Sequence, residues 1–492
     1  MEYPLLSSMK KNKDTILLLA VFVLALISSL SFQGTRGLYD RDETRYAECA
    51  REMLISGTWL TPLRNFQPHL TKPPLTYWAI ASGMKILGVN EWGARVPNAI
   101  AFSMTVLLIG LIASRVFGKS HGPPAAMIYL TSLVPFAASN IVTTDTILVL
   151  WEVAAIWAFL CGYGAKTRLR AGLWFAGMAV FWGLGFLTKG PAIFPVAAAL
   201  AMFWLLRRHE FKVFPLGIFQ ALIFSFIGLW WYFLIFYKYP WAFEFILTEQ
   251  ITGRLFVDAF HRNSAWYAPF YLYLPMILFG MLPWCLYWRR LAVKRDIFQD
   301  RSMLFIFLCW AVPLLIFSLA RSRLPLYILP VFAPMALITS KLVMEGKISP
   351  PEFLKRAGAT LALLVAIKFA AAHLPMPQDA GAMYLTFSQY LHGVKVLDTF
   401  EGHFLDGIAF YSGSHIECLP NPQKKMTQPN IAPSPWNGGL KEISNWPEIF
   451  ILDLKKKDQL SYLKDMGLYL KPISRHGKYG LFQIYKNERE LY

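Results

Sequence analysis

Charged residues are scarce in this chain of 492 residues: they make up 16% of it, whereas a soluble globular protein is usually about a quarter charged. Hydrophobic residues contribute 55%, and the mean hydropathy is +0.40. So much apolar surface is hard to bury in a water-soluble fold of this length. The composition therefore argues against an ordinary soluble enzyme and predicts an integral membrane protein.

Acidic residues are also few, 30 against 48 basic ones, which gives a formal net charge of +18. A basic excess can indicate a nucleic-acid partner, but here the basic residues lie between apolar runs, as they do in membrane proteins that keep these loops in the cytoplasm. We therefore expect no nucleic acid, and part of the charge is available for anionic lipids or a phosphate-bearing substrate. The five cysteines fit neither a disulfide framework nor a zinc site, so we expect free thiols.

Long apolar runs are abundant. The first, from about 15 to 32, follows three lysines and has no small-residue cleavage site after it, so we interpret it as an uncleaved membrane helix. The further runs are 98–117, 123–141, 146–164, 172–188, 191–206, 213–237, 267–288, 302–320, 325–341 and 358–374. A span needs about 20 apolar residues. We predict an all-α polytopic membrane protein with about 11 to 13 transmembrane helices.

The loops between these runs alternate in charge. If the N-terminus is cytoplasmic, every second loop carries basic residues, and all of these loops fall on the cytoplasmic side. They are Arg115 and Lys119; Lys166, Arg168 and Arg170; Arg207, Arg208 and Lys212; Arg289, Arg290, Lys294 and Arg295; and Lys341, Lys347, Lys355 and Arg356. An odd number of spans then places the C-terminal segment outside.

Two outer segments are too long to be turns. The first, 33–97, contains a predicted helix at 43–54 and an amphipathic stretch at 75–87, and the second covers about 238–266. After about 375 the composition becomes polar, with strand-like runs at 448–454 and 479–485 and a helical pattern between them. We predict a transmembrane domain at 1–375, which includes the first outer loop, and a small soluble α/β domain at 376–492.

This topology brings the polar residues at the outer ends of the helices to one face of the membrane. Ionisable groups at this depth are costly unless they are paired or functional. The candidates are Asp42, Glu43, Lys72, Asp145, Lys189, Glu249, Arg254, His261, Arg262, Arg321, Arg323 and Tyr327. Carboxylates together with several cations suit a reaction in which a phosphate leaves.

The acids and lysines each have a structural alternative. Asp42 is either the N-cap of the helix that follows or an essential carboxylate, a role that Glu43 shares as a candidate, and the two functions are compatible. Asp145 either caps a membrane helix or pairs with a cation. Lys72 either extends to lipid headgroups or binds a phosphate, and Lys189 lies in a Gly-Pro turn where it is either solvated or functional.

The arginines are candidates for phosphate binding. Arg254 is preferred because a guanidinium binds phosphate oxygens bidentately. Arg321 and Arg323 occupy a very short outer loop, against the general charge bias, so a specific partner such as an anionic headgroup is expected. The other charged residues of the second outer segment, Glu249, His261 and Arg262, are either charges at the rim of the membrane or part of the site.

These motifs, in this order, resemble the lipid A 4-amino-4-deoxy-L-arabinose transferases, a family related to the dolichyl-phosphate-mannose protein mannosyltransferases. The similarity covers roughly 35–335, and FLDGIAFYSG near 405–414 adds a weaker match. The matching motifs are DETRYAE from Asp42, KPP with YW from Lys72, TKG from Thr188, a Glu-x-x-x-x-Arg loop from Glu249, HR before aromatic residues from His261, and RLPLYILP from Arg323.

The resemblance implies a helical membrane fold of the GT-C type with a periplasmic α/β domain, in the bacterial inner membrane. It implies an undecaprenyl-phosphate-linked sugar as donor, an inverting transfer, and lipid A or another envelope acceptor. Asp42 and Asp145 match the family's two acids, and Lys72, Arg254 and Tyr327 match positions around the carrier phosphate.

The chain departs from the aminoarabinose members of that family at two positions. Those members typically have Glu-Lys-Pro and Glu-His where this chain has Thr71-Lys72-Pro73 and Glu249-Gln250. The replaced Glu and His resemble a metal-binding pair. We therefore expect no metal there and no cofactor, and a different sugar or acceptor, such as a protein or a polysaccharide, stays open.

Two further classes of protein remain as alternatives. A lipid or solute transporter without chemistry should carry polar groups in the middle of the membrane, often in inverted repeats, whereas here the polar groups collect at one face and no repeat is visible. An oligosaccharide ligase or polymerase would use similar chemistry, but the DETRYAE motif and its position argue against it.

Overall fold

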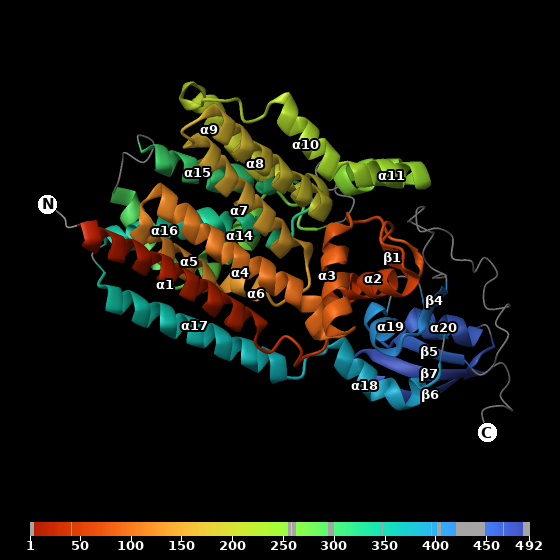
Figure 1. The fold of residues 1–492 in the computed structure, drawn as a ribbon. Helices are drawn as coiled ribbons and strands as arrows, with labels where there is room; N and C mark the ends of the chain where they lie inside the picture. The colour runs from red at the N-terminus through yellow and green to blue at the C-terminus, as the bar shows by residue number, and fades with distance from the viewer. Residues whose placement is uncertain are drawn as a thin grey trace. The chain divides into compact units, whose positions relative to one another are not determined.

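The computed structural model describes residues 4–40, 42–253, 257, 262–293, 300–346, 348–394, 396–400, 405–419, 448–465 and 467–485. The chain forms two compact units (Figure 1). The helical unit consists of 1–33, 70–79 and 95–372, and the sheet unit of 34–69, 80–94 and 373–492. Each unit is built from segments that are distant in the sequence.

All the predicted apolar runs form helices. These are α1 (Pro4–Leu30), α4 (Glu91–Val116), α5 (Gly122–Leu130), α6 (Leu133–Ala138), α7 (Thr144–Tyr163), α8 (Arg168–Lys189), α9 (Phe194–Leu206), α10 (Ile218–Gly228), α11 (Trp230–Lys238), α14 (Ala268–Gly280), η5 (Trp284–Val293), α15 (Arg301–Leu319), η6 (Pro325–Val331), α16 (Phe332–Glu345) and α17 (Pro350–His373). Short helices α12 (Trp241–Phe245) and η4 (Ile246–Thr252) follow α11.

The helices that are long and apolar enough to cross a membrane are fewer than predicted. Within the described ranges there are six, or up to seven if the bent pair α10 and α11 forms one span. The chain is thus a polytopic membrane protein, but the count falls below 11 to 13. The difference arises in part because α8 and α9 count together as one stretch, Arg168–Leu206. It also arises because several runs are broken: α5 ends before α6 at Thr131–Ser132, and α14 is a 13-residue helix with Pro275 inside it.

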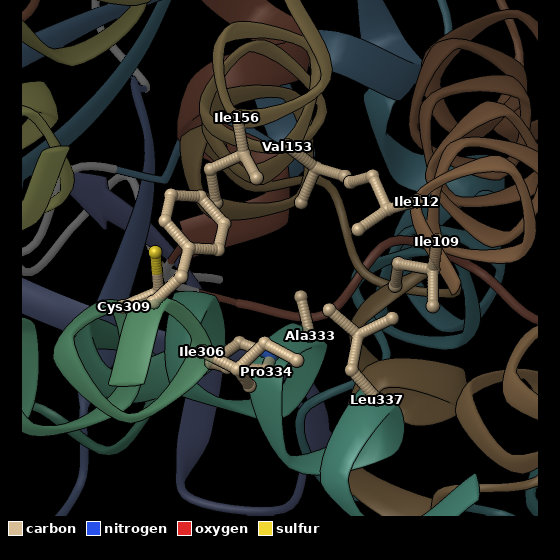
Figure 2. A pocket seen from close by; sticks show the side chains of 10 residues that line it. Ile109, Ile112, Val153, Ile156, Ile306, Cys309, Ala333, Pro334 and Leu337 are labelled. Atoms are coloured by element: carbon tan, nitrogen blue, oxygen red, sulfur yellow. The ribbon is translucent and has the colours of Figure 1, made fainter. Parts of the chain in front are cut away.

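The core of the helical unit is apolar and tightly packed. Phe159 on α7 lies 5.8 Å from Phe305 on α15, ring centroid to ring centroid. Figure 2 shows apolar side chains of α4, α7, α15 and α16 around a gap of only about 10 Å³. A second close contact joins α8 to α10, where a Cβ on Gly183 would lie 2.8 Å from Cβ of Ile227. Small residues allow this approach, as is common between membrane helices.

The sheet unit is an α/β structure, as predicted for the C-terminal segment. Its mixed sheet has the order β4-β3-β5-β7-β6. The strands are β3 (Val396–Phe400), β4 (His415–Leu419), β5 (Glu448–Asp453), β6 (Tyr469–His476) and β7 (Tyr479–Tyr485). Strand β3 pairs parallel with β4 and β5, and β7 pairs antiparallel with β5 and β6. The sequence predicted β5, β7 and the helix α20 (Lys457–Asp465), but not β3, β4 or β6.

The first outer loop folds together with the C-terminal segment. It supplies the helix α2 (Asp42–Ser56) and the hairpin of β1 (Leu63–Arg64) and β2 (Gln67–Pro68), and α3 (Leu75–Leu87) follows. The C-terminal segment supplies α18 (Ala380–Leu391) and α19 (Asp406–Ser412) beside the sheet. Arg64 forms a bidentate ion pair with Asp406, at 2.7 and 2.6 Å. The sheet unit therefore unites two segments that the sequence analysis assigned to different domains.

Candidate active site

Three of the candidate residues meet in the helical unit. Lys189 Nζ donates to Asp145 Oδ1 at 2.5 Å and lies 4.6 Å from the centroid of the Tyr327 ring. Thr143 caps α7, since its hydroxyl accepts from the backbone N–H of Asp145 at 3.3 Å. The carboxylate of Asp145 thus pairs with a cation, which decides between the two alternatives for this residue.

The turn after α8 positions Lys189. Gly190 has a φ of +61°, which an L side chain rarely adopts, and a Cβ there would lie 3.2 Å from the hydroxyl of Tyr232. The side chain of Lys189 is only 9% exposed, and that of Asp145 is 14% exposed. Lys189 is therefore not the solvated turn lysine of the structural alternative. Two opposite charges with so little contact to water attract each other more strongly than the charges of a surface ion pair.

Arg323 has its partner within the protein. Its guanidinium donates to the carbonyl oxygens of Ser318, Asn263 and Ala265 at 2.7 to 3.1 Å, and these bonds use four of its five N–H donors. The side chain is buried. Arg323 thus ties the second outer segment to the end of α15, and this explains a cation on the short loop without an anionic headgroup.

The other candidates of the helical unit differ in their exposure. Lys72 is half-buried and donates to the carbonyl of Thr71 at 3.0 Å. Arg321 is exposed, whereas Glu249 on η4 and Arg262 are half-buried. Arg254 and His261 fall outside the described residues. The structure therefore leaves the prediction of a phosphate site made by Lys72, Arg254 and Tyr327 as a prediction.

In the sheet unit, the two acids at the start of α2 differ sharply. The side chain of Glu43 is 1% exposed, and its Oε2 accepts from Arg36 at 2.7 Å and from the backbone N–H of Tyr39 at 2.9 Å. The side chain of Asp42 is 69% exposed and pairs with Arg45 on the next turn at 2.6 Å. Of the two, Asp42 is the carboxylate that a substrate can reach, and Glu43 holds the segment that precedes it.

Further carboxylates anchor the other end of α2. Glu48 pairs with Arg51 in two bonds, and Glu52 accepts from the backbone N–H groups of Asn65 and Phe66 at 2.7 Å each. Asn65 and Phe66 both have positive φ values, as in a type I′ hairpin turn. Burial, followed by the charge of Glu48, raises the pKa of Glu52 to about 8. The helix that carries Asp42 is thus fixed by buried polar contacts.

Sequence reasoning missed two polar residues near Asp145. The side-chain amide of Asn98 on α4 donates to the carbonyls of Ile141 and Thr143 at 2.6 and 3.1 Å, which fixes the segment before α7. Glu152 lies seven residues after Asp145 on α7 and is buried, and its carboxyl oxygens have no hydrogen-bond partner among the described residues. The signal for both residues is a polar side chain inside an otherwise apolar run.

The residues present do not fit a metal ion at the position implied by the resemblance. Thr71 and Gln250 replace the carboxylate and the imidazole that such a pair would need. A hydroxyl and an amide are weak ligands without charged partners. No step of the chemistry below involves a metal.

Comparisons with known proteins agree with these features. Residues 71–232 match a family model described as dolichyl-phosphate-mannose-protein mannosyltransferase. Undecaprenyl phosphate-α-4-amino-4-deoxy-L-arabinose arabinosyl transferases are similar in sequence. The transferase 2 of Sodalis glossinidius is 33% identical over 68% of this chain and 60% of its own length. The transferase of Erwinia tasmaniensis is 32% identical over 62% of this chain and 55% of its own length. The chain thus spans about 55 to 60% of these relatives.

Solved structures show the fold over nearly the whole chain. The crystal structure of ArnT from Cupriavidus metallidurans bound to undecaprenyl phosphate matches with a TM-score of 0.74 and 18% identity, and covers 94% of this chain and 97% of that one. An oligosaccharyltransferase from Archaeoglobus fulgidus matches less well, with a TM-score of 0.51, 13% identity, and 82% and 63% coverage. In its motifs and in its GT-C fold, the chain therefore resembles the polyprenyl-phosphate-dependent aminoarabinosyl transferases.

Proposed function

We propose that this protein is a glycosyltransferase that moves a sugar from undecaprenyl phosphate to an envelope acceptor. The observation that carries the proposal is the exposed carboxylate of Asp42 on a helix whose neighbouring acids are buried and paired. A reactive group needs access to substrate and a rigid support, and Asp42 has both. The similarity to enzymes named for undecaprenyl phosphate supplies the donor class.

The proposed reaction is a direct displacement with inversion. An oxygen of the acceptor attacks the anomeric carbon, and the bond from that carbon to the carrier phosphate oxygen breaks. Lys72 and Arg254 stabilise the negative charge on the departing phosphate. Tyr327 and Arg321, which belong to another of the matching motifs, are further candidates for this role. Cations that are already in place cost no reorganisation when this charge develops.

Asp42 has the role of orienting the acceptor. If the acceptor is a hydroxyl, Asp42 takes its proton as the new bond forms. If the acceptor is a phosphate, no base is needed and Asp42 positions the sugar. Asp145 keeps Lys189 against the ring of Tyr327, so its role is to arrange these groups and the donor sugar.

We propose that the reaction takes place at the periplasmic face of the bacterial inner membrane. The basic loops predict which side is cytoplasmic, and Asp42 and the C-terminal segment then fall on the other side. This assignment also makes the acceptor a component of the envelope.

The named relatives make 4-amino-4-deoxy-L-arabinose the candidate sugar, and lipid A is the candidate acceptor. Thr71 and Gln250 are the positions where this chain differs from the aminoarabinose pattern, so they are the first place to look for a different sugar. Specificity of this kind rests on a few contacts, each of which changes the rate for one substrate relative to another.

The test is donor consumption by the purified full-length protein. The protein is incubated with undecaprenyl-phosphate-linked sugars extracted from bacterial membranes, and released undecaprenyl phosphate is measured with and without lipid A. Acceptor-dependent release, lost in Asp42→Asn, supports the proposal. Failure to consume any polyprenyl-phosphate sugar would contradict it and favour a transporter.

A further inference from the structure

A second polar site lies entirely within the sheet unit. It is a cavity of about 570 Å³ between the segment that leads into α2, the start of α18, and the strand ends of the sheet. This volume is within the range of pockets that bind small molecules, roughly 300 to 1,000 Å³. The residues that matter here are Asp40, Asp379, Lys455, Arg475, Lys478 and Tyr479.

One wall of the cavity belongs to the segment that carries the proposed reactive carboxylate. Asp40 donates its backbone N–H to the carbonyl of Gln378 at 2.9 Å, and Ala380 donates to Leu38 at 2.9 Å. Asp379 accepts from the backbone N–H groups of Gly37 and Ala382, so its carboxylate is engaged in fixing this wall. Asp40 stands two residues before Asp42, and the cavity therefore borders the entrance to α2.

Three cations also line the cavity. Lys455 follows the end of β5, and Arg475 and Lys478 flank the turn between β6 and β7. Lys478 pairs with the buried Asp453 at 3.3 Å, whereas Lys455 and Arg475 are exposed. A guanidinium and an ammonium group on the same rim are the groups that proteins use to bind phosphate oxygens.

The acidic and the basic residues line the same cavity. The carboxylate of Asp40 is close enough to Tyr479 for its charge, after burial, to raise the pKa of that phenol. The cavity is thus lined both by carboxylates, which accept from hydroxyl or amino groups, and by cations, which bind an anion. Asp40 already accepts from the hydroxyl of Thr44 at 3.2 Å, but a carboxylate can accept several hydrogen bonds at once. A phosphorylated sugar carries both hydroxyl groups and an anion, so it matches this lining.

We propose that this cavity binds the phosphorylated sugar headgroup of the acceptor. The inference rests on the proposed transfer, since that is what makes a second substrate necessary. The donor is a poorer occupant of a cavity lined by three cations, because its phosphate is bonded to both the sugar and the polyprenol and carries a single charge, whereas a phosphate monoester on an acceptor sugar carries close to two. Bound here, an acceptor would present its sugar beside the segment from Asp40 to Asp42.

The test measures binding to the full-length protein in detergent by calorimetry. The probe is a soluble glucosamine disaccharide with two phosphates, compared with the same disaccharide without phosphate. The variant is Lys455→Ala with Arg475→Ala, which removes two exposed cations and leaves the Lys478–Asp453 pair intact. The matched control is Lys464→Ala with Lys471→Ala, which removes two exposed lysines of the same unit outside the cavity.

We expect the phosphorylated probe to bind, the unphosphorylated one not to bind, and the cavity variant to weaken binding about tenfold, because each exposed charge contributes modestly. The affinity of the control variant should stay within about twofold of the wild type, and undecaprenyl phosphate should bind all three proteins equally.

Vesicles that display an acylated, phosphorylated disaccharide distinguish a lipid headgroup from a soluble sugar phosphate. Tighter binding to these vesicles than to the soluble probe, with the same loss in the cavity variant, identifies the headgroup of a lipid as the ligand.

The inference is overturned if the control and cavity variants weaken binding equally, or if the cavity variant loses undecaprenyl phosphate instead. Binding to vesicles regardless of phosphate would also overturn it. A failure of the proposed function has a different signature: the probe would bind and depend on Lys455 and Arg475, but wild-type protein would transfer no sugar. Asp42→Asn separates the two further, since it should lose transfer and keep probe binding.

Discussion

The helical unit and the sheet unit use their few charged residues in different ways. In the helical unit, the Asp145–Lys189 pair stands at the end of apolar helices whose cohesion comes from packed aromatic and small side chains. In the sheet unit, buried ion pairs join segments more than 300 residues apart, as Arg64 and Asp406 show. Charge in the first unit is thus a candidate for chemistry, whereas much of the charge in the second is structural.

Polar residues that cluster in one motif need not share one role. Within DETRYAE, Asp42 is exposed, while Glu43 and Glu48 are buried and paired. Removing one partner of a buried pair leaves an uncompensated charge, which is far more costly than losing an exposed pair. Substitutions of exposed and of buried charged residues can separate these roles.

The largest effect is expected for Asp42→Asn. Loss of a positioned general base lowers rates by about 10²- to 10⁴-fold, so transfer should fall by at least about a hundredfold if the acceptor is a hydroxyl. The melting temperature should not change, because the carboxylate is exposed. Asp465→Asn, an exposed acid on α20, is the matched control and should keep full activity. Full activity in Asp42→Asn would refute its role.

The pair in the helical unit should behave differently. Asp145→Asn or Lys189→Met alone leaves a partly buried charge without its partner, and we expect both a loss of transfer and a loss of stability of roughly 3 kcal/mol. The double variant removes both charges and should recover most of the stability but no activity. Recovery of activity in the double variant would show that the pair is structural only.

A purely structural result is expected for Arg64→Ala in the sheet unit. It leaves the carboxylate of Asp406 buried and unpaired, so the free energy of unfolding of this unit should fall by about 3 kcal/mol. Hydrogen exchange of β1 and α19 measures this locally. Lys471→Ala, an exposed site, should change stability by less than about 0.5 kcal/mol. An equal effect of the two variants would contradict the structural role of the Arg64–Asp406 pair.

A gradual effect is expected when the pH is changed. Burial raises the pKa of Glu52 from 4.5 to about 8 in the folded protein, so the folded state holds this proton more tightly than the unfolded state does. The resulting stabilisation is complete below pH 4.5, declines as pH rises, and is lost above about 8. The melting temperature should therefore fall between pH 5 and 8, and Glu52→Gln should flatten this dependence. An unchanged slope in the variant would rule out Glu52 as the source.

Much of the helical unit could be predicted because hydropathy reports membrane helices directly. The apolar runs predicted at 146–164 and 302–320, for example, correspond to the helices α7 and α15. The number of spans could not be predicted as well, since Pro275 and the break between α5 and α6 shorten helices that composition alone treats as long. The strands β3 and β4 could not be predicted because they pair in parallel with α19 between them, so no short turn marks them as a hairpin. Strand β6 pairs with the neighbouring β7, but its sequence YLKPISRH contains Pro472 and charged residues and lacks a strand-like apolar run.

The candidate site was predicted in part. Motif spacing pointed to Asp145, Lys189 and Tyr327, and the structure brings these three together. Motif spacing could not show that the guanidinium of Arg323 donates to backbone carbonyls or that Glu43 is buried, because both depend on tertiary contacts. The attachment of the first outer loop to the C-terminal segment was equally invisible, since Arg64 and Asp406 lie far apart in the sequence.

The most direct test of the proposed transfer is mass spectrometry of envelope glycolipids from cells with the wild-type chain, without it, and with Asp42→Asn. We expect a glycolipid that loses the mass of one sugar in both the null strain and the variant, and regains it when the wild-type chain is restored. Identical glycolipids in all strains would contradict transfer to a lipid acceptor, and an unchanged glycolipid in the Asp42→Asn strain alone would remove Asp42 from the reaction.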